Sequence, residues 1–533
     1  MKRIALLGIL LTTVFTASAA VAATKASSVT RHNITWTFDK DYEIGQFVNG
    51  DPWVIGPVKI VSITNDLSDE KYKPEDADVS GSMVNPVVDN SSFQVSQRQG
   101  FDDRIKYYDP ELNAALPNGK PISKDNPLVL KPSSSLLSTV SWLWRSPEDK
   151  EPDAPKAPDN PPAQHMRPTL RAASVLTVLD KAPPEGSFRP AYAGNDKTIR
   201  FNVSDIRFDR LRNFAPVGPI DAAPIDDRVT PQLPNPPLPG DPYYKLGPQS
   251  VHGLVKVTER VFLDHVPGWY GGEAYHPTLN MPNYGREINN IWQTAMLALN
   301  LDWDKLGRAK EKPSKKALAV NMIQIGIDLT GMADNGTFWP DDGGHDHGRK
   351  PVILFTGLLL DDPHMKNVGN WNVQFQDNNQ TFYVAEQHIE ITNHEHWRET
   401  KTDKRSGNIM PYKKEHLGMP EWGIAQVRIP HSINAGWNSM YRDINAASIP
   451  GHALVFMMME DGRKLFNHEA YFDYADRLKS SGEALFAPWH AGNRPPPFPR
   501  EMWEAYRDQF PTTYDKKWDA PEITDYITQP KEQ

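Results

Sequence analysis

The sequence contains no cysteine among its 533 residues. This absence excludes disulfide bonds, a thiolate nucleophile, a thiolate metal site and a lipid-modified cysteine behind a signal peptide. A chain of this length buries ample core without covalent staples, and it is long enough for two or more domains. Two further motifs are missing: a Gly-x-Ser-x-Gly elbow and a glycine-rich phosphate loop. Esterase, ATPase and dehydrogenase functions are therefore disfavoured.

The sequence also lacks a block of Lys or Arg, and its formal net charge is -9. Binding to a phosphate backbone draws on clustered cations, so we expect no nucleic-acid partner. Aromatic residues, by contrast, make up 10% of the chain, with 15 Trp and 18 Tyr. Exposed aromatic rings suit sugar rings, although packing in the core explains most of them.

Long apolar runs are absent except at the N-terminus. Lys2 and Arg3 precede an apolar stretch over 4–15, and small residues occupy 21–23. This order is typical of a secretory signal peptide. The stretch is shorter than the ~20 residues that span a bilayer. We predict a signal peptide over 1–23 with cleavage before Thr24, a periplasmic or secreted protein that is not a lipoprotein, and no membrane span.

The region after the signal has the pattern of short β-strands. Residues 34–38 alternate between apolar and polar, and 54–63, 175–179 and 255–262 are further β-rich runs. Proline cannot donate to a sheet ladder or lie inside a helix, so two proline-dense segments, 146–168 and 215–242, are predicted to be long surface loops. We therefore predict a β-sandwich-like domain over 24–284.

From Gly285 onward the apolar residues follow the period of a helix. The stripe that begins at Ile288 and Ile291 predicts an amphipathic helix. The next helix, over 315–333, is apolar around most of its circumference, and its polar seam faces either an internal cleft or a partly exposed edge. That seam consists of Asn321, Gln324 and Asp328. Further helices are predicted over 349–360, 437–446, 451–459, 466–478 and 500–509, whereas 381–384 fits a strand or the middle of a helix.

The fold class predicted from these patterns is α+β with several domains: the β-sandwich-like domain, then a domain of helical hairpins over 285–533. This layout resembles the secreted polysaccharide lyases and related glycan-active enzymes built on an (α/α) toroid with an accessory β-sandwich. The resemblance is architectural and covers most of the mature chain, although in that class the β-domain more often follows the toroid. It implies an α/α-toroid-like helical domain and a polysaccharide or oligosaccharide substrate.

The densest polar cluster lies at 341–350, where His345, His347, Arg349 and Lys350 stand among glycine and aspartate residues. The loop runs directly into the helix that begins near Arg349. A helix N-terminus offers free N–H groups to an anion, and the cations add to that field. A uronate carboxylate would fit there; the alternative is a solvated glycine-rich turn without a ligand.

A second cluster contains His388 and the segment 393–398. In a strand, His394 and His396 would share one face, where they can bind a metal or flank a substrate. His345 and His347 have the same His-x-His spacing, so the two loops can supply four imidazoles to one ion. A divalent metal, zinc or calcium, is thus a cofactor that the sequence allows but does not require. The alternative is a pair of surface-exposed histidines.

A third cluster extends from 421 to 442 and has the residue types that β-elimination of a uronide requires. A cation or amide must neutralise the carboxylate, a His or Tyr must remove the C5 proton, and a Tyr hydroxyl can protonate the departing oxygen. If 437–446 is helical, Trp437, Asn438, Tyr441 and Arg442 lie within about one turn, just after His431. Alternatively, Trp437 and Tyr441 are core residues.

The leading hypothesis is a lyase that cleaves an acidic, uronate-containing polysaccharide by β-elimination. The aromatic loop 268–276 serves in this hypothesis as a sugar platform, or else as a packed hinge between domains. The alternatives are a non-catalytic glycan-binding protein, a glycoside hydrolase using two carboxylates, and a metal-dependent hydrolase using the His-x-His pairs. The predicted catalytic residues are His347, Arg349, His394, His431, Tyr441 and Arg442, the substrate-binding residues are Trp269, Tyr270, Lys350, Trp437 and Asn438, and the metal ligands are His345, His347, His394 and His396.

Overall fold

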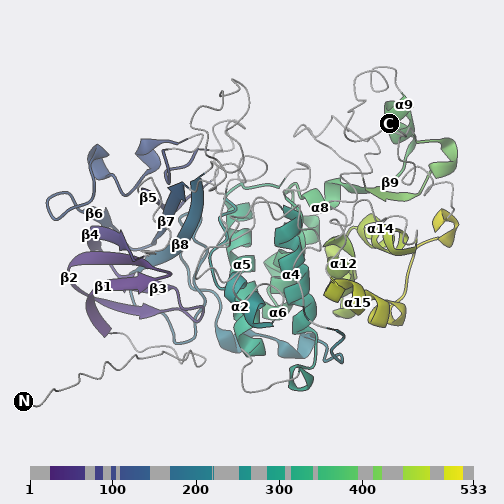
Figure 1. The fold of residues 1–533 in the computed structure, drawn as a ribbon, viewed down its shortest axis with the longest axis horizontal. Helices are drawn as coiled ribbons and strands as arrows, with labels where there is room; N and C mark the ends of the chain where they lie inside the picture. Colours follow the sequence, from purple (N-terminus) through teal and green to yellow (C-terminus); the bar gives the residue numbers. More distant parts are fainter. Residues whose placement is uncertain are drawn as a thin grey trace, which may run out of the picture.

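The protein has an N-terminal β-sheet domain and a C-terminal helical region (Figure 1), so the predicted α+β class is confirmed at this level. The computed structural model describes residues 24–66, 79–87, 98–103, 108–143, 168–218, 220, 251–265, 285–306, 314–339, 346–393, 412–422, 448–480 and 497–519. Within these ranges no helix is both long and apolar enough to cross a membrane.

Eight strands form one continuous sheet. They are β1 (Thr24–Arg31), β2 (Ile34–Gln46), β3 (Pro52–Ile55), β4 (Val58–Asn65), β5 (Val79–Val84), β6 (Leu128–Leu130), β7 (Ser134–Leu143) and β8 (Pro168–Leu179). Their order is β5-β7-β8-β3-β2-β4-β6, with β1 paired to β2. Only the β3–β8 pair is parallel. The strands predicted at 34–38 and 175–179 are confirmed, and the run 54–63 falls on two strands, β3 and β4, with a break at residues 56–57.

The sheet curls over itself. Trp36 on β2 donates from Nε1 to Ser138 Oγ on β7 at 3.0 Å, although β8 and β3 separate these strands in the sheet. One face encloses its own core, to which Trp36 and Leu136 belong. The next residue along β7, Leu137, points to the other face and joins the core of the helices, because side chains alternate along a strand. The curled sheet is thus anchored to the helical region.

The helical region contains the elements that hold the candidate site. Its main helices are α2 (Val251–Thr258), α4 (Gly285–Leu299), α5 (Lys315–Asp334), α6 (Arg349–Leu360), α7 (Pro363–Lys366), α8 (Gln376–Asn379), α9 (Glu386–Asn393), α12 (Ile449–Met458), α13 (Gly462–Phe466), α14 (Glu469–Ser480) and α15 (Pro497–Tyr506). The predicted helices within the described ranges are confirmed, and 381–384 contains a strand, β9 (Thr381–Tyr383), paired with β10 (Pro420–Trp422). The helix predicted at 437–446 and nearly all of both proline-dense segments lie outside the described residues.

The strand predicted over 255–262 is wrong. Residues up to Thr258 belong to helix α2, and the following residues form no helix or strand. The side chain of Asn321 on α5 donates to Val255 O at 3.0 Å, and α2 packs along α5. Tertiary packing therefore overrides the β-propensity of the valines in this segment.

The polar seam of α5 forms the junction between the sheet domain and the helices. The guanidinium of Arg189 donates twice to Asp328, at 2.9 and 2.6 Å, and once to Asp51 of the sheet domain, at 2.7 Å. The Arg189 backbone N–H donates to Gln324 Oε1 at 3.1 Å. Together with the contact of Asn321 to α2, these bonds occupy the seam, so it is neither a cleft nor an exposed edge.

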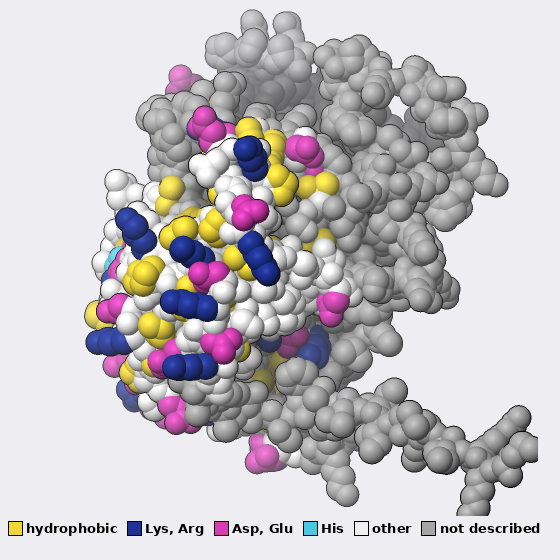
Figure 2. Space-filling view, turned by 90° about the vertical axis from the view of Figure 1, so that its left-hand side faces the viewer, with side chains coloured by type: hydrophobic (Ala, Val, Ile, Leu, Met, Phe, Trp, Pro, Cys, Tyr) yellow, Lys and Arg dark blue, Asp and Glu magenta, His cyan; other side chains and the backbone are white. Residues whose placement is uncertain are grey.

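The outer face of the sheet domain carries side chains of both charges. Figure 2 shows Lys and Arg side chains interspersed with Asp and Glu, and small hydrophobic groups lie between them. On the described part of this face no large area has a single sign.

Candidate functional site: a buried histidine and aspartate cluster

The site is built around the turn that starts helix α6. Gly348 caps this helix with a left-handed backbone, φ +87°, a conformation that glycine adopts without strain. Its N–H donates to Asp377 Oδ1 at 2.8 Å, and the N–H of Asp346 donates to Gln376 Oε1 at 2.6 Å. These two bonds fix the short helix α8 against the start of α6. They bring the Asp377 carboxylate to the side chain of His347.

His347 and Asp377 form an imidazole–carboxylate pair in the interior. Both side chains are about 1% exposed, and His347 Nδ1 lies 3.9 Å from Asp377 Oδ1. Neither ring nitrogen of His347 has a hydrogen-bond partner within the described part of the chain. Burial on its own raises the pKa of Asp377, but the imidazole of His347 and the Gly348 N–H outweigh it, so the pKa lies below its usual range. Asp377 is therefore an anion that can orient the ring of His347.

A second histidine, His452, enters the cluster from helix α12. A Cβ added at Gly348 would lie 3.2 Å from His452 Cε1, so this ring packs directly on the α6 turn. Burial lowers the pKa of His452 to about 4, against the opposing effect of the Asp377 charge. His452 is consequently neutral near pH 7, and its Nε2 has no partner in the described ranges. The cluster thus holds one carboxylate and a neutral imidazole side by side with His347.

Helix α4 adds a polar face to the same place. Asn289 packs against Gly348, and Gln293, one turn later, packs against Gly451 at the start of α12. Both polar atoms of the Asn289 amide lack a partner among the residues that the structure describes. A buried polar atom without a partner costs about 1–3 kcal/mol. Several such atoms in one place are expected where bound water or a ligand completes the hydrogen bonds.

Two tryptophans border the cluster. The ring of Trp422, on β10, lies 6.1 Å from the ring of His347 and is tilted by 32°. Trp292, on α4, lies beneath the guanidinium of Arg349 at 5.3 Å. Within the described part of the chain, neither indole N–H has an acceptor. The cluster is therefore polar at its centre and aromatic at its border.

The predicted catalytic residue Arg349 is engaged in an ion pair. Its guanidinium donates to both oxygens of Asp264 at 2.8 Å, and to His347 O at 2.7 Å. Trp339 Nε1 donates to the same carboxylate at 2.9 Å. These bonds hold the backbone of His347 in place. In this structure Arg349 therefore positions the turn and does not present a free cation to a ligand.

Lys350, predicted to bind substrate, is also buried. Its Nζ donates to Asn378 Oδ1 at 2.6 Å and lies 4.2 Å from the centre of the Phe466 ring. Burial lowers the pKa of Lys350 to about 7, although the negative charge of Asp377 acts in the opposite direction. A buried ammonium with this pKa can change its protonation state near neutral pH.

Most other predicted site residues lie outside the described residues, and their roles remain predictions. These are Trp269, Tyr270, His345, His394, His396, His431, Trp437, Asn438, Tyr441 and Arg442. Of the proposed metal ligands only His347 is described, and within the described ranges no group of three or more His, Asp or Glu could hold a metal ion. His388, from the second histidine cluster, accepts a hydrogen bond at Nδ1 from the Ala385 N–H at 2.9 Å, a local turn contact.

The sequence did not single out Asp377, His452 or Asn289 as site residues. Asp377 lies in a short helix without a periodic signal, and His452 is a lone histidine in an apolar helix. Asn289 had one weak signal in the sequence. It is a polar residue directly after an apolar one in the helix that begins at Gly285, next to the face predicted to be buried. It is fully buried although the helix was predicted to be amphipathic.

Comparisons of the chain with protein-family models, with curated proteins and with solved structures gave no match in any of the three.

Proposed function

We propose that this protein is an exported enzyme that cleaves an acidic, uronate-containing polysaccharide by β-elimination. We place its reaction centre at His347, Asp377, His452 and Asn289. One observation supports this proposal above the others: two imidazoles, a carboxylate and an amide converge in the interior, and ring nitrogens and amide atoms remain unpartnered among the described residues.

The groups of the cluster match the requirements of proton abstraction next to a carboxylate. An amide such as Asn289 can donate to the uronate carboxylate, which stabilises the charge that develops when the C5 proton leaves. If Nδ1 of His347 carries its proton toward Asp377, the lone pair of Nε2 is free to accept that C5 proton. The separation of 3.9 Å is longer than a hydrogen bond, but such contacts often shorten when a substrate binds. Tyr441 remains the predicted donor to the departing oxygen.

The finer fold assignment also belongs to this proposal. We propose that the helices complete an (α/α) toroid. The packing of chain neighbours α4, α5 and α6, together with the return of α12 onto α4, supports it. Secretion to the periplasm or the medium follows from the signal predicted over 1–23, which lies outside the described residues.

The direct test is to incubate the purified full chain with a panel of uronate polysaccharides and to record the ultraviolet absorbance of the product. β-Elimination leaves a double bond conjugated to the carboxylate, whereas hydrolysis yields reducing ends without that absorbance. We expect absorbance to rise with at least one polymer. New reducing ends without the absorbance, or no cleavage of any polymer, would contradict the proposed reaction.

The residue assignment is tested with His347→Gln and Asp377→Asn. His347→Gln should reduce turnover by about 10²–10⁴-fold, the usual contribution of a general base. Asp377→Asn, which removes the charge that orients the His347 ring, should also reduce turnover. The matched control is His364→Gln, since His364 pairs with Asp334 at 2.8 Å on the surface, with its side chain 47% exposed. Circular dichroism should show all three variants folded. Full activity in His347→Gln would remove the cluster as the reaction centre.

A further inference from the structure

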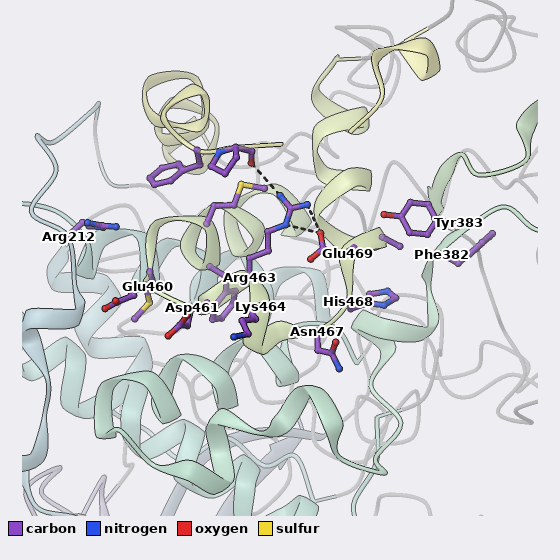
Figure 3. Close-up of a pocket in the computed structure, with 17 residues that line it drawn as sticks. Arg212, Phe382, Tyr383, Glu460, Asp461, Arg463, Lys464, Asn467, His468 and Glu469 are labelled. Atoms are coloured by element: carbon purple, nitrogen blue, oxygen red, sulfur yellow. Dashed lines mark hydrogen bonds and ion pairs between the residues drawn. The ribbon is translucent and has the colours of Figure 1, made fainter. Parts of the chain in front are cut away.

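A separate pocket, lined by none of the cluster residues, lies beside helix α13. It has a volume of about 980 Å³, near the upper end for small-molecule sites. Its walls come from the end of α12, from α13, from the start of α14 and from β9 (Figure 3). His468 lines the pocket and is close enough to Lys350 for that cation to lower its pKa. None of the catalytic, substrate-binding or metal-binding residues predicted from the sequence lines this pocket.

Two cations in this pocket have no ion-pair partner in the part of the chain that the structure describes. Arg463 pairs with Glu469 at 2.6 Å, and Glu460 pairs with Arg210 at 3.4 Å. Arg212 donates from Nε to Met458 O at 2.7 Å, but within the described residues neither its guanidinium nor the ammonium of Lys464 has an ion-pair partner. The whole lining contains as many carboxylates as cations, with Glu460, Asp461 and Glu469 against Arg212, Arg463 and Lys464. The preference for a negatively charged group is therefore local to Arg212 and Lys464.

The opposite end of the pocket presents aromatic and neutral polar groups. Tyr383 is 39% exposed, and its hydroxyl donates to Asp473 Oδ2 at 2.7 Å, which fixes the orientation of the ring. His468 Nε2 lies 2.8 Å from Thr381 O, and because a carbonyl only accepts, this nitrogen carries the proton. Burial and then the nearby Lys350 lower the pKa of His468 to about 4, so the ring is neutral and its Nδ1 can accept a hydrogen bond.

We propose that this pocket binds a short uronate oligosaccharide and so anchors the acidic polysaccharide outside the reaction centre. Figure 3 places Arg212 and Tyr383 at opposite ends, with Lys464 between them. One sugar ring stacks on Tyr383, while the carboxylates of the following units meet Lys464 and Arg212. The inference rests on the proposed function only for the class of substrate. The charged and aromatic side chains of the pocket form a site that is separate from the reaction centre.

The test is calorimetric titration of a uronate tetrasaccharide into the full chain carrying His347→Gln, which suppresses turnover. In that background, the double change Arg212→Gln and Lys464→Gln should weaken binding by about tenfold or more, since a hydrogen bond to a charged group contributes about 1.5–3 kcal/mol. Tyr383→Leu should weaken it several-fold. Lys120→Gln, a change of an exposed lysine on the sheet domain, is the matched control and should leave binding unaltered.

Unchanged affinity in the double variant, or equal affinity for a neutral tetrasaccharide of the same length, would overturn the anchoring site. The two proposals fail separately. If the unmodified protein cleaves uronate polymers but the pocket variants bind the tetrasaccharide normally, only the anchoring site is overturned. Binding that depends on Arg212 and Lys464, without cleavage of any polymer by the unmodified protein, would support the anchoring site and contradict the lyase activity.

Discussion

Gly348 is the position at which the geometry of the cluster can be tested most directly. Its backbone is left-handed, with φ +87°, and its N–H donates to Asp377. A Cβ at this position would collide with Asn289 Oδ1 and would lie 3.2 Å from His452 Cε1. Gly348→Ala therefore adds one methyl group at the point where α4, α6 and α12 meet.

Two effects set the expected magnitude. A left-handed conformation costs an L-residue about 1–2 kcal/mol. Overpacking of a close-packed interior adds about 1–3 kcal/mol, because Asn289 or His452 must leave its place. We expect Gly348→Ala to lower the free energy of unfolding by about 2–5 kcal/mol. Displacement of Asn289 should also reduce the cleavage rate.

Urea denaturation followed by far-ultraviolet circular dichroism measures this loss, and Gly119→Ala is the matched control. Gly119 is also left-handed, with φ +69°, but no atom lies within 4 Å of the added Cβ. The control should therefore lose only the conformational part, about 1–2 kcal/mol. Equal losses in the two variants would refute the packing of Asn289 and His452 on the α6 turn.

Two further predictions concern stability. Arg189→Met leaves Asp328 buried without its ion-pair partner and removes one of the two arginines that bind Asp51, the other being Arg31 at 3.3 Å. It should destabilise the protein by about 3–5 kcal/mol in urea. Arg200→Met, which removes an exposed pair, should cost less than about 1 kcal/mol, and similar losses in both variants would contradict a buried junction. The pKa of His452 is about 4 in the folded state against an ordinary 6.5, so the unfolded chain binds the extra proton and stability should rise as pH increases from 4 to 6.5. His452→Gln should flatten that rise, and an unaltered pH profile of the unfolding free energy would show that His452 is not buried in its neutral form.

The helices were predictable where one periodic pattern dominates a long segment. The stripe that begins at Ile288 and the apolar run of 315–333 each fix a helix, because only a helix places such residues together. The segment from Val255 misled the prediction, since alternating β-branched residues occur in strands and in short buried helices alike. Its partner, Asn321, lies 66 residues later in the sequence, a distance over which local patterns carry no information.

Part of the candidate site was predictable for a different reason. His347 was found because histidines and cations crowd a glycine-rich segment that leads into a helix. Asp377 and His452 could not be found in this way, since neither has an unusual neighbourhood in the sequence. Their importance comes from convergence on one turn, and that convergence depends on how α8 and α12 pack on α6. Arg349 was predicted to be a free catalytic cation for the same reason. Its partner Asp264 lies 85 residues away in the sequence, so the ion pair could not be seen from local patterns.

The surroundings of the cluster support the proposal that it is a reaction centre rather than a packing defect. A defect would be relieved by rotation or by small shifts of the backbone. Here Arg349 clamps the carbonyl of His347 while its other donors bind Asp264, and the Gly348 N–H holds Asp377. The satisfied bonds lie around the turn, whereas the unpartnered atoms among the described residues belong to His347, Asn289 and His452, which lie at the turn itself. A rigid frame around unsatisfied polar groups is what preorganised catalysis requires, because the groups then need no rearrangement when a substrate arrives.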